Sequence, residues 1–355
     1  MDEIGISVCV CTYRRPPLLA RLLDGLARQE GLSARFEVVV VDNDREGSAG
    51  PVVGEARRRH PGLALATAVE PIQNIARARN RTVRMARGTW LAFIDDDEAP
   101  SPRWLAALMR AAAEHSADGV FGPVLPILPA AAPAWVWRGG FFDRPRHATG
   151  ELVPDAELRT SNGLIRRDLL VPPPPAPARR HLPVVGGGAT AATARTGDGA
   201  PAIDPAPFDE RYGLSGGEDS VLLTALARRG ARFVWSDDAT VMEMVPHDRT
   251  TVAYLLRRSF GAGCGHARLR LEREGMRALP SLLARGGGAV GAGAVLAVAS
   301  LPLGFDHAVR WSRIGAAGAG KLAAIAGLRY ETYRRPSTWI EPLEQAPPAA
   351  AAAAR

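Results

Sequence analysis

Continuous apolar runs alternate with segments of helical periodicity in the N-terminal third of the chain. The apolar runs are 6–11, 37–41, 63–69 and 90–94. Short runs of this kind, rich in β-branched residues, are typical of strands buried on both faces of a parallel sheet. Helical spacing predicts helices over 18–26 and 75–86, and Ser101-Pro102 begins another, with the proline in its first turn. The alternation predicts an α/β fold with a mostly parallel sheet.

Polar residues follow several of these runs directly. Thr12 follows the first run, Asp42 follows the second, and the run ending at Ile94 leads into Asp95-Asp96-Asp97-Glu98. Because the carboxyl ends of parallel strands meet at one edge of the sheet, a ligand is expected at that edge. A carboxylate such as Asp42 can accept hydrogen bonds from a ribose hydroxyl or a nucleobase N–H, although Asp-Asn-Asp is also ordinary turn sequence.

The four consecutive acids indicate a cation. Carboxylates crowded into one loop repel one another, and a hard divalent cation relieves that repulsion. Because Mg²⁺ and Mn²⁺ favour a few carboxylates together with phosphate oxygens, this arrangement suits a diphosphate substrate carried with its metal. A solvated acidic turn before the helix that begins near Ser101 is the alternative.

A second acidic group, Glu218-Asp219, opens a predicted helix that stops at Gly230. Gly216-Gly217 precede it, which lets the backbone approach a ligand closely and leaves the acids exposed. The helix dipole is expected to keep a carboxylate ionised here, ready to accept a proton from a hydroxyl. Helix capping alone would also account for these acids.

The remainder of the chain is less regular. Segment 121–245 loses the alternation, and Pro, Ala and Gly dominate 171–207, which predicts an extended insertion. No charge occurs between 286 and 303, but five glycines and a proline favour a membrane-surface hairpin or a buried helix over a transmembrane helix. The arginines expected to meet an anionic membrane are Arg257, Arg258, Arg268, Arg270 and Arg273. The tail 341–355 is expected to be disordered.

Composition narrows the classes of function. The formal charge is +7, but Lys321 is the only lysine among 44 basic residues, which indicates a compositional bias toward Arg rather than a binding stripe. The sequence contains no recognisable nucleic-acid-binding motif, and we expect no nucleic-acid partner. Three cysteines imply neither a disulfide framework nor a zinc site, and the start lacks the features of a secretory signal, which favours a cytoplasmic enzyme.

Six segments occur in the order seen in family 2 glycosyltransferases. They are 8–16 (VCVCTYRRP), 41–43 (VDN), 78–80 (ARN), 93–98 (FIDDDE), 162–167 (NGLIRR) and 216–219 (GGED). Over about residues 4–260 the chain resembles bacterial exopolysaccharide glycosyltransferases of the succinoglycan-biosynthesis type. The resemblance implies a GT-A fold, with a Rossmann-type, mostly parallel sheet and helices on both faces, and metal-dependent, inverting transfer from a nucleotide sugar to a saccharide or lipid-linked acceptor.

The resemblance also implies a domain plan. A GT-A domain would cover 1–250, with a nucleotide-binding half at 1–120 and an acceptor half at 121–250. The uncharged stretch 286–303 and the arginines before it, which lie largely beyond the resemblance, predict a C-terminal helical region at 251–340 that contacts the membrane peripherally. This would place the enzyme at the cytoplasmic face of the cell membrane.

Roles for single residues follow from the same resemblance. The positions implied at the nucleotide sugar are Thr12, Tyr13, Arg14, Asp42, Arg79, Asn80, Asp95 and Asp96. Asp95 and Asp97 match the outer acids of the DXD motif and would hold Mg²⁺ or Mn²⁺, while Asp219 matches the catalytic base and Glu218 would position the acceptor. Many relatives have a metal-binding His after the last strand; here either Glu243 or His247 would complete the site. Most of the other arginines in and just after the helix predicted over 75–86 are expected on a solvated face.

Two other readings stay open at this point. Residues 286–291 satisfy the G-x-G-x-x-G pattern of dinucleotide-dependent oxidoreductases, although no convincing strand precedes them. A basic module that binds membranes or nucleic acid without catalysis is the second alternative, and salt-sensitive binding without a nucleotide sugar would reveal it.

Overall fold

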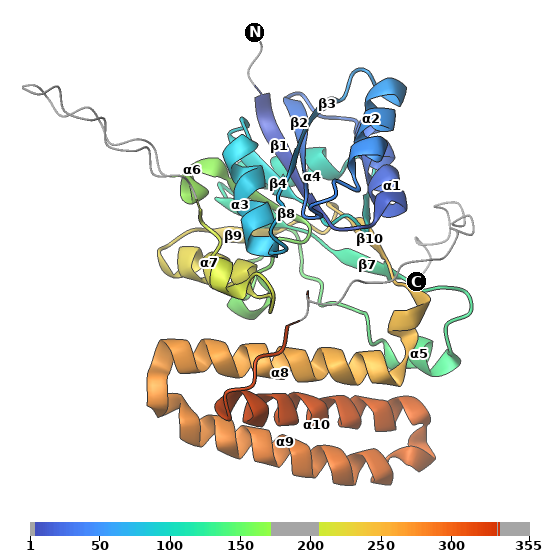
Figure 1. The fold of residues 1–355 in the computed structure, drawn as a ribbon, viewed down its shortest axis with the longest axis vertical. Helices are drawn as coiled ribbons and strands as arrows, with labels where there is room; N and C mark the ends of the chain where they lie inside the picture. The colour runs from blue at the N-terminus through green and yellow to red at the C-terminus, as the bar shows by residue number, and fades with distance from the viewer. Residues whose placement is uncertain (1–3, 172–205, 332, 334–355) are drawn as a thin grey trace, which may run out of the picture.

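The computed structural model describes residues 4–171, 206–331 and 333. The predicted insertion therefore lies almost entirely outside the described residues, and the predicted tail lies wholly outside them. An α/β body carries the first two thirds of the chain, and three long helices form a separate layer beneath it (Figure 1).

The main sheet has seven strands in the order β3-β2-β1-β4-β8-β6-β9. Their bounds are β1 (Ile4–Thr12), β2 (Arg35–Asp42), β3 (Ala64–Val69), β4 (Trp90–Phe93), β6 (Gly119–Phe121), β8 (Gly163–Arg166) and β9 (Phe233–Trp235). Strands β1 to β4 pair in parallel, and so do β6 and β9, whereas β8 is antiparallel to both of its neighbours. The strand order changes direction between β1 and β4, which is where open α/β sheets bind ligands.

Helices cover both faces of this sheet, as predicted. They are α1 (Pro16–Ala27), α2 (Gly50–Arg59) and α4 (Trp104–Glu114) on one face, and α3 (Ile75–Met85) and α7 (Glu218–Arg228) on the other. In β1, Val8 and Val10 pack against the first set while Cys9 packs against the second, since alternate strand residues point to opposite faces. Two apolar cores therefore enclose the sheet.

Several local predictions were wrong. Strand β3 is an edge strand whose side chains are partly exposed, because only β2 pairs with it. Helix α4 begins at Trp104 with Arg103 as its N-cap, so Pro102 lies before the helix. Helix α2 was not predicted, since it buries only Val53 and Ala56.

A small second sheet was also missed. It has the order β5-β10-β7 and consists of β5 (Glu98–Pro100), β10 (Val241–Met244) and β7 (Val124–Ile127). By pairing β10 with β5, it brings Glu243 opposite Glu98, directly after the acidic loop. The short helices α5 (Ala134–Gly139) and α6 (Arg167–Leu170) lie in the connections.

The C-terminal layer consists of α8 (Val252–Glu274), α9 (Leu279–Ala299) and α10 (Phe305–Ile325). Glycines allow these helices to approach closely: a Cβ on Gly293 would lie 2.6 Å from the Gly315 Cα. The G-x-G-x-x-G segment at 286–291 lies inside α9 rather than in a strand-to-helix loop, which removes the structural basis of the oxidoreductase alternative. The buried-helix interpretation of 286–303 was wrong, because most of this stretch is exposed.

Candidate active site

The acidic loop after β4 is hydrogen-bonded to the loop after β1. Thr12 Oγ1 donates to Asp96 Oδ2 at 2.8 Å. The Arg15 guanidinium donates to Asp96 Oδ1 at 3.0 Å and to Asp97 Oδ2 at 3.2 Å. Asp96 is thus turned into the protein, with 5% exposed. The Asp95 side chain is 47% exposed, whereas that of Asp97 is 10% exposed and is paired with Arg15. Sequence reasoning assigned no role to Arg15, although it lies within the 8–16 segment.

Arg79 joins the two groups of acids that the sequence analysis singled out. Its Nη1 donates to Glu218 Oε1 at the start of α7, and its Nη2 lies 3.7 Å from Asp95 Oδ1 in the acidic loop. Arg79 is only 8% exposed, so it belongs to the interior of the site, and Asn80 beside it is fully buried. The acids after β4 and the acids of α7 therefore face one common site.

The two acids of α7 differ in environment. Glu218 is 1% exposed, contrary to the prediction of an exposed pair. Burial raises the pKa of Glu218 to about 7, against the attraction of Arg79. Its Oε2 has no hydrogen-bond partner among the described residues.

Asp219 is more accessible and is held in a fixed orientation. Its Oδ1 accepts a hydrogen bond from the Ser220 amide at 2.7 Å. Its Oδ2 accepts from the Thr160 amide at 3.2 Å and from the Thr160 hydroxyl at 3.4 Å. Of the two acids, Asp219 is the one that can meet a substrate from solvent.

The remaining acids, Asp95, Asp97 and Glu243, lie among arginines. Desolvation raises the pKa of Asp95 to about 6 although 47% of its side chain is exposed, and the charges of Asp97 and Glu243 add to the rise. Arg249 Nη1 lies 3.7 Å from Asp97 Oδ2 and 3.5 Å from Glu243 Oε1. Arg144 also pairs with Glu243.

These donors fit a hard divalent cation in their chemistry. Asp95, Asp97 and Glu243 offer the carboxylate oxygens that such a cation prefers. Within the described ranges, however, no three acidic, His or Cys side chains converge into a ready-made metal centre. His247 is exposed at the start of a 3₁₀ turn (His247–Thr250), and the choice between it and Glu243 stays a prediction.

The predicted nucleoside positions lie at the ends of β1 and β2. Asp42 is buried, and its carboxylate accepts hydrogen bonds from the amides of Ala49 at 2.6 Å and Asp44 at 3.0 Å. Arg14 is exposed, has a left-handed backbone with φ 54°, and pairs with Asp44 at 3.1 Å. Tyr13 lies against Arg14, with the guanidinium carbon 5.2 Å from the ring centroid. Tyr13 and Arg14 therefore form the accessible side of this loop.

Two asparagines of the recognised segments hold the backbone. The Asn80 amide donates to the Phe208 carbonyl at 2.8 Å and accepts from the Phe208 amide at 2.9 Å. Asn162 Nδ2 donates to the carbonyls of Pro123 and Ala239, and its Oδ1 accepts from the Trp104 indole at 2.7 Å. Sequence reasoning did not foresee these roles, since the partners are distant in sequence.

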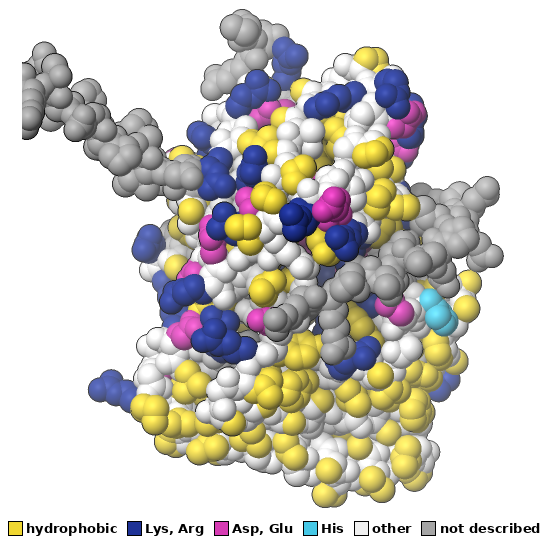
Figure 2. Space-filling model, in the orientation of Figure 1, with side chains coloured by type: hydrophobic (Ala, Val, Ile, Leu, Met, Phe, Trp, Pro, Cys, Tyr) yellow, Lys and Arg dark blue, Asp and Glu magenta, His cyan; other side chains and the backbone are white. Residues whose placement is uncertain are grey.

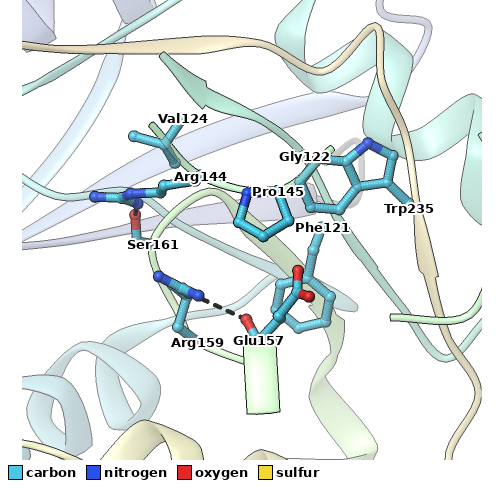
Figure 3. A pocket seen from close by; sticks show the side chains of 9 residues that line it. All are labelled: Phe121, Gly122, Val124, Arg144, Pro145, Glu157, Arg159, Ser161 and Trp235. Atoms are coloured by element: carbon cyan, nitrogen blue, oxygen red, sulfur yellow. Dashed lines mark hydrogen bonds between the residues drawn. The ribbon is translucent and has the colours of Figure 1, made fainter. Parts of the chain in front are cut away.

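A pocket opens beside the acidic loop (Figure 3). It is lined by Phe121, Gly122, Val124, Arg144, Pro145, Glu157, Arg159, Ser161 and Trp235. Ser161 Oγ donates to Glu98 Oε1 at 2.5 Å, and Glu98 Oε2 accepts from the Asp95 amide at 3.0 Å. The pocket wall is thereby connected to the loop that carries Asp95.

Comparison with known proteins identifies the family of the chain. Residues 7–158 match the sequence model of Glycosyl transferase family 2. Succinoglycan biosynthesis protein ExoM of Rhizobium meliloti (strain 1021) is 33% identical over 280 residues, which cover 78% of this chain and 79% of ExoM. The chain belongs to glycosyltransferase family 2.

A solved structure of a mannosyltransferase agrees with the fold. The mannosyltransferase PcManGT from Pyrobaculum calidifontis, solved with GDP-Man and Mn²⁺, is 21% identical with a TM-score of 0.56, covering 92% of this chain and 88% of PcManGT. S. aureus TarS 1-349 in complex with UDP is 18% identical with a TM-score of 0.48, covering 92% of this chain and 93% of that one. The family 2 chain is thus a glycosyltransferase with a GT-A fold, as the sequence segments predicted.

Proposed function

We propose that this family 2 glycosyltransferase moves a sugar from a nucleoside-diphosphate sugar to a saccharide or lipid-linked saccharide during polysaccharide synthesis. The observation that supports the proposal is the guanidinium of Arg79, which lies between Glu218 and Asp95. Glu218, which we propose for the acceptor side, and Asp95, which we propose for the donor side, therefore belong to one site. The likeness to ExoM supports polysaccharide synthesis, and the GDP-Man bound by PcManGT supports a nucleotide sugar.

On the donor side, the chain's own cations and hydroxyls hold the acidic loop. Thr12 and Arg15 fix Asp96, and Arg15 also holds Asp97. Asp95, the most exposed of the three, would face the diphosphate. Mg²⁺ or Mn²⁺ held by Asp95 and Asp97, with Glu243 or His247, would neutralise the charge that develops on the leaving diphosphate. Tyr13, Arg14 and Asp42 would lie on the nucleoside side, at the ends of their strands.

On the acceptor side, Asp219 takes the proton from the attacking hydroxyl. The amides of Ser220 and Thr160 orient the Asp219 carboxylate. Glu218, held by Arg79, would position the acceptor beside it. Attack on the face of the anomeric carbon opposite the diphosphate gives inversion.

The C-terminal helices would bring the enzyme to the cytoplasmic face of the membrane. Residues Val252–Ala299 include a stretch long and apolar enough to cross a membrane, with mean hydropathy 1.6 and 17% of it buried. Figure 2 shows hydrophobic side chains gathered over the layer of α8 to α10, while charged side chains are most frequent on the body above. We propose peripheral contact through this face, which would suit a lipid-linked acceptor.

A panel of nucleotide sugars tests the proposed function. With Mn²⁺ and saccharide or lipid-linked acceptors, the wild-type chain should release a nucleoside diphosphate from at least one donor. Asp219→Asn should lower the transfer rate by about 10²- to 10⁴-fold, the usual contribution of a general base, with nucleotide binding retained. The absence of release across the whole panel, or tight NAD binding without metal, would contradict the proposal.

A further inference from the structure

After α10 the chain returns to the α/β body. Beyond α10, residues 326–331 and 333 run back past α8 toward the α/β body (Figure 1). Tyr330 packs edge-on against Phe260 of α8, with ring centroids 5.9 Å apart. It also covers Gly261, where a Cβ would lie 2.7 Å from the Tyr330 ring. This returning segment is therefore seated on α8.

The backbone of Tyr333 is held between two loops of the active site. Its amide donates to the Leu214 carbonyl at 3.0 Å, in the loop that precedes the acids of α7. Its carbonyl accepts a hydrogen bond from Gln73 Nε2 at 2.6 Å, in the loop that precedes α3. Since α3 carries Arg79, Tyr333 is anchored to both elements that supply the central ion pair.

The Tyr333 ring lies beside the glycines that precede Glu218. A Cβ on Gly216, which has φ +80°, would meet the ring at 3.4 Å. The phenol is within electrostatic range of Glu218, Arg79 and Asp219. Because 42% of Tyr333 remains exposed, part of its surface is open to a ligand.

We propose that Tyr333 binds the acceptor sugar, an inference that rests on the proposed function. A sugar ring presents an apolar C–H face and a polar rim, and it is recognised best where an aromatic ring lies beside carboxylates. Tyr333 supplies such a ring beside Gly216, two residues before Glu218 and three before Asp219, so an acceptor that meets Asp219 could also contact the ring. The segment that follows α10 would thereby contribute a residue to the transfer site.

The kinetic test compares Tyr333→Ala with Tyr333→Phe. Tyr333→Ala should raise the KM for the acceptor about tenfold, while the KM for the donor stays within about twofold. Tyr333→Phe should restore most of the acceptor affinity, because it keeps the ring. Thermal unfolding of each variant checks that the fold is retained.

The control is Tyr330→Leu, which alters the same segment away from the acids. Acceptor KM should change little in this variant; an increase equal to that of Tyr333→Ala would overturn direct binding by Tyr333. A rise in the donor KM of Tyr333→Ala would assign the ring to the nucleotide instead and would also overturn the proposal. Unchanged kinetics in an active enzyme would do the same, whereas an inactive wild-type chain would overturn the proposed function itself.

Discussion

At the scale of single residues, Arg79 connects the chemistry of donor and acceptor. It is buried, pairs with Glu218 and lies 3.7 Å from Asp95, so the charge of each acid influences the other through one guanidinium. A buried ion pair of this kind is costly to break, because the remaining partner is left without compensation. Arg79 thereby couples the start of α7 to the acidic loop.

The ionisation of Glu218 gives a prediction for stability. Burial raises the pKa of Glu218 from 4.5 to about 7. In this interval the unfolded chain releases the proton and the folded chain keeps it, so the free energy of unfolding falls as pH rises. Glu218→Gln removes this contribution, which is at most about 3 kcal/mol.

Urea unfolding of wild type and Glu218→Gln between pH 4.5 and 7 measures the effect. The unfolding free energy of wild type minus that of Glu218→Gln should fall steadily as pH rises. The exposed Glu55, changed to Gln, serves as the control and should show no such trend. A constant difference between wild type and Glu218→Gln across this range would refute a raised pKa in the folded chain.

The positions of the site residues could be predicted, but not all of their environments. Thr12 and Asp96 end up near one another because they lie at the ends of adjacent strands, and strand ends are visible in the apolar pattern. The burial of Glu218 was missed, since the first turn of a helix is usually exposed. The contact of Arg15 with Asp97 depends on a partner 82 residues away, which no local pattern reveals.

At the scale of elements, the hydrogen bonds of Asn80 fix the position of α3 against the chain at Phe208. Both backbone groups of Phe208 are satisfied by this one buried side chain. Asn80→Ala should lower the free energy of unfolding by about 1 to 3 kcal/mol, because it leaves buried polar groups unpaired. Chemical denaturation measures the loss.

Asn80→Asp is the matched variant, because it keeps the acceptor for the Phe208 amide and loses the donor. Asn80→Asp should also be less stable than wild type. If both variants are as stable as wild type, Asn80 does not hold α3 against the chain at Phe208. Nucleotide affinity, measured on the same proteins, tests separately the expectation that Asn80 contacts the nucleotide.

Element prediction succeeded where the apolar signal was long. The leucine periodicity of α1 and the β-branched run of β2 identified both elements. Strands β6 and β9 have three residues each, too few to show an alternation. The antiparallel direction of β8 depends on its neighbours β4 and β6 rather than on its own residues.

At the scale of the whole molecule, the exposed face of the C-terminal layer predicts vesicle binding. Val295, Val298 and Leu303 are 67%, 69% and 74% exposed. Arg268 and Arg270 pair with Glu272 and Glu274, so the apolar residues carry more of the expected attraction than these two arginines do. Co-sedimentation with phosphatidylglycerol vesicles should recover the wild-type protein.

Replacing Val295 and Leu303 together by Glu should weaken this binding at least about tenfold. The change removes apolar groups that would be buried in the membrane, and it adds negative charge. Leu152→Glu is the control, because Leu152 is equally accessible, at 61%, but lies in the α/β body. Equal sedimentation of the double variant and wild type would exclude this face as the membrane contact.

The three-helix layer itself was only partly predictable. Glycines between 286 and 293 lowered the apparent hydrophobicity of α9, whereas in the structure Gly293 permits close contact with α10. The return of the chain to Gln73 and Leu214 could not be foreseen either, because it depends on how the layer is placed beneath the sheet. The predicted boundary near residue 250 stays a prediction.

One feature of the sheet's second apolar core bears on how the chain can be engineered. Leu170 enters this core just before the segment 172–205, and Phe208 enters it just after, held in place by Asn80. Leu170 and Phe208 are thus each anchored in the core by their own contacts. Sequence added between these two anchors would leave both anchoring contacts in place, which makes this stretch the natural place to carry an internal fluorescent reporter or affinity handle.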